Sequence, residues 1–276
     1  MTLLLENQVA IITGAGRGIG AATAKLFASQ GARVVVSDLD SAPAEEVVAA
    51  IKADGGEALA CAGDVTDPTF PDKVVKAAID AYGKLNVLVN NAGYTWDGML
   101  HKMSEKQFMA MLEVHNVAPF RMVRAAAPYM RDASKAERSA GQKPESRCIV
   151  NVSSVAGLNG NVGQINYSTA KSGIAGMTKT IAKEWGAFGI RCNAVAFGMI
   201  ETRLTQDQEA GEVISMAGEA VKLGIPGYMK GMINMLIPLG RPGTPDDAAG
   251  AILLLASPYA SYITGHVLEV TGGLQA

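Results

Sequence analysis

Short apolar runs recur along the chain, and most are separated by segments long enough to form a helix. The runs cover residues 9–13, 33–37, 57–61, 86–90, 148–153, 191–196 and 266–270. Several carry valine and isoleucine at successive positions, which is typical of strands covered on both faces. Residues 18–30, 42–54, 68–82, 104–130, 165–187 and 245–256 are predicted helices. This alternation predicts an α/β fold with a doubly wound parallel sheet of about seven strands, flanked by helices.

Two stretches interrupt the alternation. Residues 132–147 are polar and charged, which predicts either a solvated loop or an extension of the preceding helix. Residues 205–238 form a long segment with several glycines and the methionines Met216, Met229, Met232 and Met235. No linker rich in proline, glycine and serine divides the chain, so residues 1–276 are expected to form a single domain.

Composition excludes several classes of protein. Hydrophobic residues make up 49% of the chain and the formal net charge is -2, which argues against nucleic-acid or membrane-surface partners. The three cysteines are far apart, so neither a disulfide framework nor a metal site is expected, and a reducing cytoplasm fits best. No signal peptide is expected from the first residues, and no apolar run approaches the about 20 residues of a membrane helix.

A glycine cluster follows the first predicted strand and opens the first predicted helix. Glycine lets the backbone turn tightly and approach a pyrophosphate, and the free N–H groups of the helix end favour its charge. An ordinary strand–helix turn is the alternative, but the position of the cluster favours a dinucleotide site in a Rossmann-type sheet. The candidate residues are Gly14, Gly16, Arg17, Gly18, Ile19 and Gly20.

Asp38 ends the second predicted strand, 18 residues beyond Gly20. A carboxylate at this place accepts hydrogen bonds from the adenosine ribose and repels a 2′-phosphate. Leu39 follows instead of an arginine, which favours NAD over NADP, whereas Arg17 could meet a phosphate. The alternative role for Asp38 is to cap the next helix, a task open also to Asp40 or Ser41.

Tyr167 and Lys171 lie four residues apart in a predicted helix and therefore share one face. A nearby ammonium stabilises phenolate, so Lys171 is expected to lower the pKa of Tyr167 and make it a proton donor and acceptor. Ser154 lies 13 residues earlier at a strand end, where its hydroxyl could hold a substrate carbonyl. Turn capping is the alternative role of both Ser153 and Ser154, and it is the preferred interpretation of Ser153.

Taken together, these motifs resemble the short-chain dehydrogenase/reductase family over nearly the whole chain. Asn90-Asn91-Ala92-Gly93, residues 189–195 and residues 238–242 match as well. The resemblance implies catalytic roles for Asn116, Ser154, Tyr167 and Lys171, with Asn116 anchoring a proton-relay water. It implies further cofactor contacts from Asp64, Val65, Asn91, Ala92, Gly93, Ile200 and Thr202. Where the family usually has Pro-Gly, this chain has Phe197-Gly198, which constrains the backbone less.

The resemblance implies hydride transfer between NAD(H) and a carbonyl or secondary alcohol, with no metal. The pattern is most similar to 3-oxoacyl-thioester reductases and 3-hydroxyacyl dehydrogenases, and residues 203–240 would form a substrate lid. The apolar lid fits an acyl substrate, but it could equally pack on its own core or on a neighbouring subunit. Secondary alcohol, steroid and sugar dehydrogenases share these motifs, and a catalytically silent subunit is a further alternative. A homotetramer is also implied.

The dispersed His101, His115 and His266 are interpreted as structural or exposed.

Overall fold

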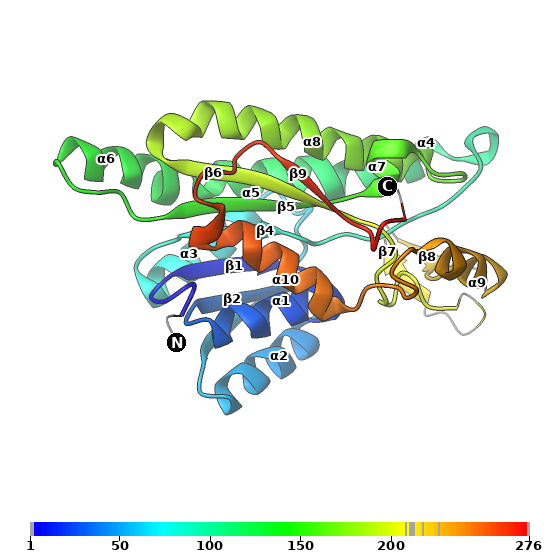
Figure 1. Ribbon diagram of the computed structural model, residues 1–276, viewed down its shortest axis with the longest axis horizontal. Helices are drawn as coiled ribbons and strands as arrows, with labels where there is room; N and C mark the ends of the chain where they lie inside the picture. Colours follow the sequence, from blue (N-terminus) through cyan, green and yellow to red (C-terminus); the bar gives the residue numbers. More distant parts are fainter. Residues whose placement is uncertain (1–2, 208, 210–212, 217, 226, 275–276) are drawn as a thin grey trace.

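The computed structural model describes residues 3–207, 209, 213–216, 218–225 and 227–274, and its centre is one parallel sheet (Figure 1). The strands are paired in the order β3-β2-β1-β4-β5-β6-β9, and every neighbouring pair is parallel. This confirms the predicted α/β fold and its seven strands. Their bounds are β1 Val9–Thr13, β2 Arg33–Asp38, β3 Glu57–Ala62, β4 Val87–Asn90, β5 Arg147–Ser154, β6 Ile190–Phe197 and β9 Val267–Val270.

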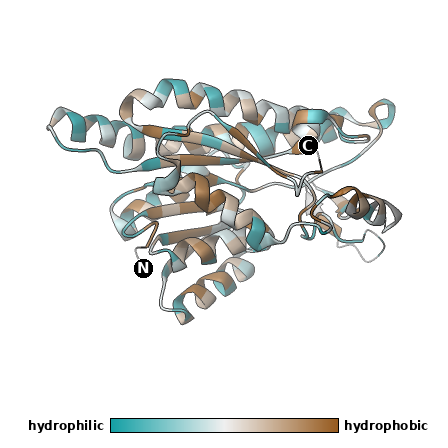
Figure 2. Ribbon diagram, viewed as in Figure 1, coloured by the Kyte–Doolittle hydropathy of each residue, from teal (hydrophilic) through white to brown (hydrophobic). Residues whose placement is uncertain are grey.

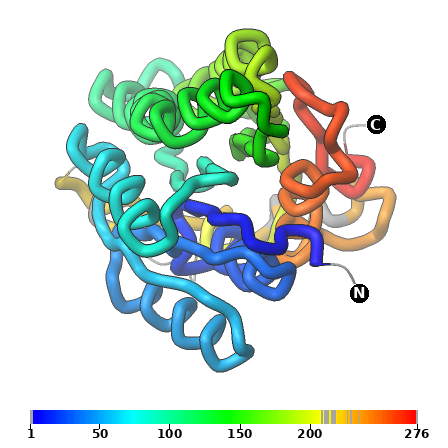
Figure 3. Tube along the Cα trace, turned by 90° about the vertical axis from the view of Figure 1, so that its left-hand side faces the viewer, coloured from blue at the N-terminus to red at the C-terminus, as the bar shows by residue number. Residues whose placement is uncertain are grey.

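Helices cover both faces of the sheet, as the views of Figures 1 and 3 agree. One face carries α1 (Gly18–Ser29), α2 (Ser41–Ala53) and α10 (Pro245–Ala256), and the other carries α3 (Phe70–Tyr82), α5 (Ala118–Ala127) and α8 (Ile165–Trp185). Successive strand residues point to opposite faces. Ala10 and Ile12 therefore enter one apolar core, while Val9 and Ile11 enter the other. The hydrophobic colouring of the strands in Figure 2 follows from this two-sided burial.

The strand order places a crevice where the site is expected. β1 pairs with β2 on one side and with β4 on the other, so the connections leave β1 in opposite directions. In an open parallel sheet, ligands bind beyond the carboxyl ends of the strands at this point of reversal. The carboxyl ends of β1, β2, β4 and β5 carry Thr13, Asp38, Asn90 and Ser154.

The predicted helix over residues 104–130 is longer and less regular in the structure. It begins with α4 (Glu105–Leu112), passes through a π-helical turn at Glu113–Val117 into α5, and passes a second π-helical turn at Pro128–Asp132 into α6 (Ala133–Ser139). The polar stretch that follows Met130 is thus partly helical, which confirms the helix-extension alternative up to Ser139. A π turn adds one residue to the helical repeat and changes which side chains face the core.

Several short elements had no clear signal in the sequence. They are α7 (Val155–Asn159), the antiparallel hairpin of β7 (Val213–Met216) and β8 (Glu219–Lys222), and α9 (Gly227–Leu236). In α9 the side chains of Met232 and Met235 are 58% and 81% exposed, whereas those of Met216 and Met229 lie outside the described residues. Within the described ranges, no helix has the length and apolar character needed to span a membrane.

Arg191 on β6 fastens α10 to the sheet, which gives a stability prediction. The residue is 8% exposed, and its guanidinium donates to the backbone oxygens of Leu255 (2.6 Å) and Ala256 (3.2 Å) at the helix C-terminus. Arg191→Met removes the charged donor from these buried carbonyls, so we expect a loss of about 2–3 kcal/mol in the free energy of unfolding. Urea denaturation measures this loss. The exposed control Arg124→Met should change stability by less than about 0.5 kcal/mol, and equal effects of the two variants would contradict the assignment.

Candidate active site

The glycine turn between β1 and α1 has the geometry of a phosphate cradle. Gly14 and Gly18 have φ angles of 62° and 53°, in the left-handed region that glycine adopts without strain. A Cβ at Gly20 would overlap the carbonyl oxygen of Gly14, so the turn closes tightly onto the start of the helix. Asn91 fixes the turn from β4, because its amide donates to the oxygens of Thr13 (2.9 Å) and Gly14 (3.0 Å).

Asp38 lies beside this turn at the end of β2. Its Oδ2 accepts a hydrogen bond from the backbone N–H of Gly16 at 2.8 Å. The alternative that Asp38 caps the next helix is wrong, because the residue at the N-cap of α2 is Asp40. Arg17 Nη1 forms an ion pair with Asp40 Oδ2 at 2.9 Å. The positive charge that could attract a cofactor phosphate is therefore partly balanced by a carboxylate.

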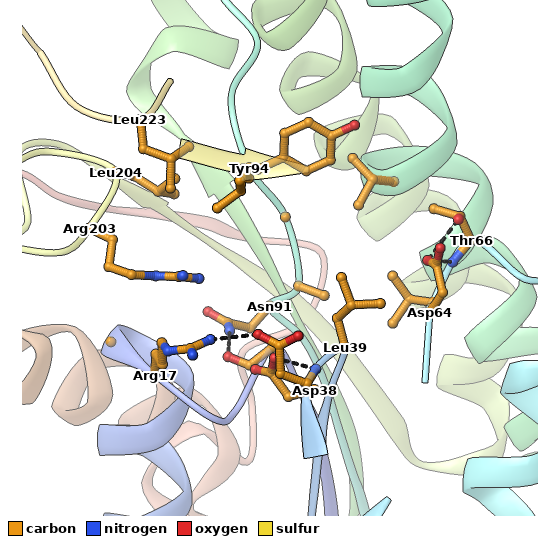
Figure 4. Close-up of a pocket in the computed structure, with 18 of the residues that line it drawn as sticks. Arg17, Asp38, Leu39, Asp64, Thr66, Asn91, Tyr94, Arg203, Leu204 and Leu223 are labelled. Carbon is orange, nitrogen blue, oxygen red and sulfur yellow. Dashed lines mark hydrogen bonds and ion pairs between the residues drawn. The ribbon is translucent and has the colours of Figure 1, made fainter. Parts of the chain in front are cut away.

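A cavity of about 600 Å³ opens beyond the glycine turn (Figure 4). Asp38, Asn91 and Tyr94 lie around it, and Arg17 and Arg203 extend toward it in the same view. Among the predicted cofactor residues, those that line the cavity are Gly14, Arg17, Gly18, Ile19, Asp38, Leu39, Asp64, Val65, Asn91, Ala92, Gly93 and Thr202. Gly16 and Gly20 belong to the turn but do not line the cavity. Ile200 is buried and forms an isolated β-bridge with Gly243.

Sequence analysis missed the other wall of the cavity. Tyr94, Leu204, Val213, Ile214 and Leu223 line it, and they come from the loop after β4 and from the segment after Thr202. The β7–β8 hairpin covers the ends of strands that are far from it in the sequence, and such a contact leaves no local pattern of residues. The only available signal was the apolar character of the segment after Thr202.

The structure brings Tyr167, Lys171 and Ser154 together. Tyr167 and Lys171 share one face of α8, and the Lys171 ammonium lies 5.6 Å from the centre of the Tyr167 ring. Ser154, at the end of β5, lies near the Tyr167 hydroxyl and acts to lower the pKa of the phenol. The Lys171 Nζ donates to the carbonyl oxygen of Val152 at 2.8 Å, which fixes the ammonium between the helix and the sheet. These three residues do not line the 600 Å³ cavity.

The expectation that Ser153 caps the turn after β5 is wrong. The capping hydroxyl is that of Ser154, which accepts from the N–H of Ala156 at the start of α7 (3.2 Å). Ser153, which was expected to cap the turn, donates instead to the carbonyl oxygen of Lys171 (2.8 Å) and ties the strand to α8. Phe197, at the position where the family usually has proline, is buried and remains in the β6 ladder opposite Ser154.

Burial dominates the electrostatics of the pair. It raises the pKa of Tyr167 to about 12, although the hydrogen bond from Ser154 acts in the opposite direction. It lowers the pKa of Lys171, which is 4% exposed, to about 7. The expectation that Lys171 lowers the pKa of Tyr167 is therefore wrong for this structure. Because both groups lose solvation, each favours its neutral form, and the phenol keeps its proton at neutral pH.

An apolar cluster covers the phenol. Tyr94, Trp96 and Val114 pack in it with Ile214 and Val221 of the hairpin, and Tyr167 lies against them. An ion pair between Lys106 of α4 and Glu219 of β8, 2.7 Å long, joins the hairpin to the body of the protein. Ile214 and Val221, from the segment after Thr202, therefore pack in the same apolar cluster as Tyr167, which remains partly exposed.

The predicted residue Asn116 lies in the π turn next to this cluster. Its Nδ2 donates to the carbonyl oxygen of Ala170 on α8 at 2.9 Å. The neighbouring His115, expected to be structural or exposed, is buried and packs edge-on against the Tyr167 ring, with the ring centres 5.2 Å apart. Among the described residues, no three side chains of His, Cys, Asp or Glu gather as metal ligands would.

Comparison with known proteins identifies the family. A model of the short chain dehydrogenase family matches residues 8–213. The chain belongs to this family. It is 39% identical over 272 residues to a 3-oxoacyl-[acyl-carrier-protein] reductase of Synechocystis, with 98% of each chain covered. Over 270 residues it is 38% identical to a reductase of the same name from Thermotoga maritima, again with 98% of each chain covered. An uncharacterized oxidoreductase of Mycobacterium bovis is 40% identical over 281 residues, with 99% of each chain covered.

The shifted pKa of Lys171 predicts how the stability of this short-chain dehydrogenase depends on pH. Lys171 takes up a proton below its usual pKa of 10.5 in the unfolded chain, but only below about 7 in the folded protein. Unfolding therefore binds a proton between these pH values, and the stability of the wild type rises with pH by up to about 1.4 kcal/mol per unit. Lys171→Met removes this contribution, so the stability of the variant relative to wild type should fall as pH rises.

Urea denaturation at pH 7.5 and 9.5, without added dinucleotide, measures the difference. Lys179→Met, an exposed position on the same helix, is the control and should follow the wild type at both pH values. A stability difference between Lys171→Met and wild type that is independent of pH would show that burial does not depress the lysine pKa.

Proposed function

We propose that the protein transfers a hydride between NAD(H) and the carbonyl or hydroxyl carbon of a 3-oxoacyl or 3-hydroxyacyl thioester. The observation that carries this proposal is that Ser154 and Tyr167 lie together beside the buried Lys171, next to a glycine-lined cavity. The names of the Synechocystis and Thermotoga maritima relatives support a 3-oxoacyl thioester as the substrate.

The residues present fit a nicotinamide dinucleotide. The turn has space for a pyrophosphate at Gly18, where an added Cβ would meet nothing nearer than Thr202 at 3.5 Å. The carboxylate of Asp38 faces the same cavity and can accept hydrogen bonds from ribose hydroxyls. Its negative charge and the pairing of Arg17 with Asp40 favour NAD over a cofactor with a 2′-phosphate. When bound, the nicotinamide supplies or accepts the hydride.

The chain's own residues supply orientation and the proton. The hydroxyls of Ser154 and Tyr167 lie together, so a substrate carbonyl oxygen can accept hydrogen bonds from both. A phenol with a pKa of about 12 stays protonated until negative charge develops on that oxygen, and then donates its proton. The hydrogen bond from Lys171 Nζ to the carbonyl oxygen of Val152 keeps the lysine near the phenol while charge develops on the phenol oxygen. In the oxidative direction the same residues accept the proton.

The surroundings of Tyr167 favour an apolar substrate. Tyr94, Trp96, Leu204, Ile214 and Val221 supply apolar surface from two different segments. An acyl chain that enters between the hairpin and the loop after β4 would bury methylene groups against them, each worth about 0.8 kcal/mol. Residues 203–240 then act as the lid within a single domain comprising residues 1–276, and lid closure excludes water.

We further propose that the protein forms homotetramers. Exposed apolar side chains, including Phe120 and Tyr262, support association between copies of the chain. Light scattering coupled to size-exclusion chromatography measures the assembly directly.

The assignment of Tyr167 is tested by Tyr167→Phe, which keeps the ring and removes the proton. We expect kcat/KM for acetoacetyl thioesters to fall by at least about 100-fold, because general acid catalysis contributes about that much or more. Tyr259→Phe, at an exposed position, is the control and should retain activity. A panel of steroids and simple secondary alcohols in the same assay distinguishes the substrate class. A wild type that binds NADH but reduces no carbonyl compound would favour a catalytically silent subunit.

Cofactor preference depends on the charge of Asp38. Asp38→Asn keeps an acceptor for the Gly16 N–H but removes the charge that repels a 2′-phosphate. We expect the ratio of kcat/KM for NADH to kcat/KM for NADPH to fall by about 10-fold or more, which corresponds to about 1.4 kcal/mol. Glu46→Gln on the exposed face of α2 is the control. A wild type that prefers NADPH would overturn the cofactor assignment.

A further inference from the structure

Arg203 is a cationic residue of the cavity to which the proposed chemistry gives no role. It follows Thr202 directly, is half-buried, and lines the same cavity as the glycine turn. Figure 4 shows its side chain extending into this cavity, as that of Arg17 does. Among the described residues that line the cavity, Arg17 and Arg203 are the two that carry a positive charge.

The backbone of Arg203 belongs to a hydrogen-bonded turn. The N–H of Thr202 donates to the Thr205 hydroxyl at 2.9 Å, and the N–H of Leu204 donates to the Thr202 hydroxyl at 3.3 Å. The N–H of Thr205 donates in turn to the carbonyl oxygen of Thr202 at 3.1 Å. Three hydrogen bonds therefore fix the backbone from which the Arg203 side chain enters the cavity.

This turn lies across from the start of α1. A Cβ added at Gly18, the first residue of that helix, would meet the Thr202 methyl group at 3.5 Å. The first turn of α1 contains no acidic side chain, and the free N–H groups of a helix N-terminus attract phosphate. An anion bound in front of α1 therefore lies beside the segment that carries Arg203.

The other charges of the cavity explain why a cation is needed there. The carboxylates that line it are those of Asp38, Asp40, Asp64 and Glu113. Arg17 lies 2.9 Å from Asp40, which balances part of its charge. A pyrophosphate diester is a dianion, and these carboxylates repel it. A guanidinium on the facing wall offsets this repulsion and can donate two parallel N–H bonds to phosphate oxygens.

We propose that Arg203 binds the pyrophosphate of the dinucleotide, so that the anion is held between the start of α1 and this guanidinium. The inference rests on the proposed function, since it adds a ligand for the proposed cofactor. It assigns Arg203 to the phosphates and not to the reacting carbon. Leu204, the next residue, packs on the apolar cluster around Tyr167, so one turn contributes to both halves of the site.

Direct binding measurements with three ligands test this role. ADP-ribose contains the pyrophosphate but no nicotinamide, NADH contains both, and adenosine contains neither. Isothermal titration calorimetry gives Kd for each ligand with the full-length wild type, Arg203→Met and Arg203→Lys. The matched control is Lys222→Met, which removes an exposed cation from β8 that does not line the cavity.

We expect Arg203→Met to raise Kd for ADP-ribose and NADH by about 10-fold or more, because charge-assisted hydrogen bonds to the phosphates are lost. Kd for adenosine should stay at the wild-type value, which also shows that the cavity of the variant is intact. The loss should shrink as the NaCl concentration rises, because salt screens the charges. Arg203→Lys keeps the charge without the planar fork, so its Kd values should be intermediate. Lys222→Met should follow the wild type.

Unchanged binding of ADP-ribose by Arg203→Met overturns the inference, as does an equal loss of adenosine binding, which would indicate a distorted cavity. A second assay measures KM for acetoacetyl-coenzyme A and for the phosphate-free acetoacetyl-N-acetylcysteamine. A rise confined to acetoacetyl-coenzyme A, with Kd for ADP-ribose unchanged, would place Arg203 on substrate phosphates and overturn the inference as well. Arg203→Gln, polar but uncharged, takes the place of Arg203→Met if that variant does not fold.

The same measurements keep this inference distinguishable from the proposed function. If the wild type binds neither NADH nor ADP-ribose, both fail. If Arg203→Met binds both ligands as the wild type does, only the role of Arg203 fails. Binding requires no turnover, so activity retained by Tyr167→Phe would remove the proposed acid and leave the role of Arg203 standing.

Discussion

Parallel strand pairing is the constraint on which the site depends. Because all seven strands run in the same direction, their carboxyl ends meet at one edge of the sheet. Glycines after β1, a carboxylate at the end of β2, an amide after β4 and a hydroxyl at the end of β5 are thus brought together from distant parts of the sequence. None of these groups forms a site by itself, and their convergence follows directly from the order of the strands.

Water exclusion gives this edge its chemistry. The apolar cluster packs against the Tyr167 ring, Lys171 is buried beside it, and burial moves their pKa values in opposite directions. A phenol that holds its proton firmly is suited to donate it only when charge develops on a neighbouring oxygen. The hairpin is held by apolar contacts of Ile214 and Val221, and the exposed Lys106–Glu219 pair adds little stability to them.

The π turn between α4 and α5 connects the two halves of the site. It brings His115 against Tyr167 and against the backbone that lines the dinucleotide cavity, while Asn116 binds α8. An uninterrupted α-helix would rotate successive side chains by about 100° each and would orient this pair differently. The irregular turn therefore decides which of two adjacent polar residues packs against Tyr167.

The sequence by itself determined the sheet, its helices, the glycine turn and the Tyr167–Lys171 pair. These features depend on local periodicity, on the backbone freedom of glycine and on the four-residue spacing of a helix face, all of which can be read from neighbouring residues. Only the tertiary structure decided that Ser154 and not Ser153 caps α7, that burial raises the pKa of Tyr167, that a hairpin covers the cavity, and that His115 packs against the phenol. Each of these depends on contacts between segments far apart in the chain, because solvation and packing are set by what surrounds a residue in space.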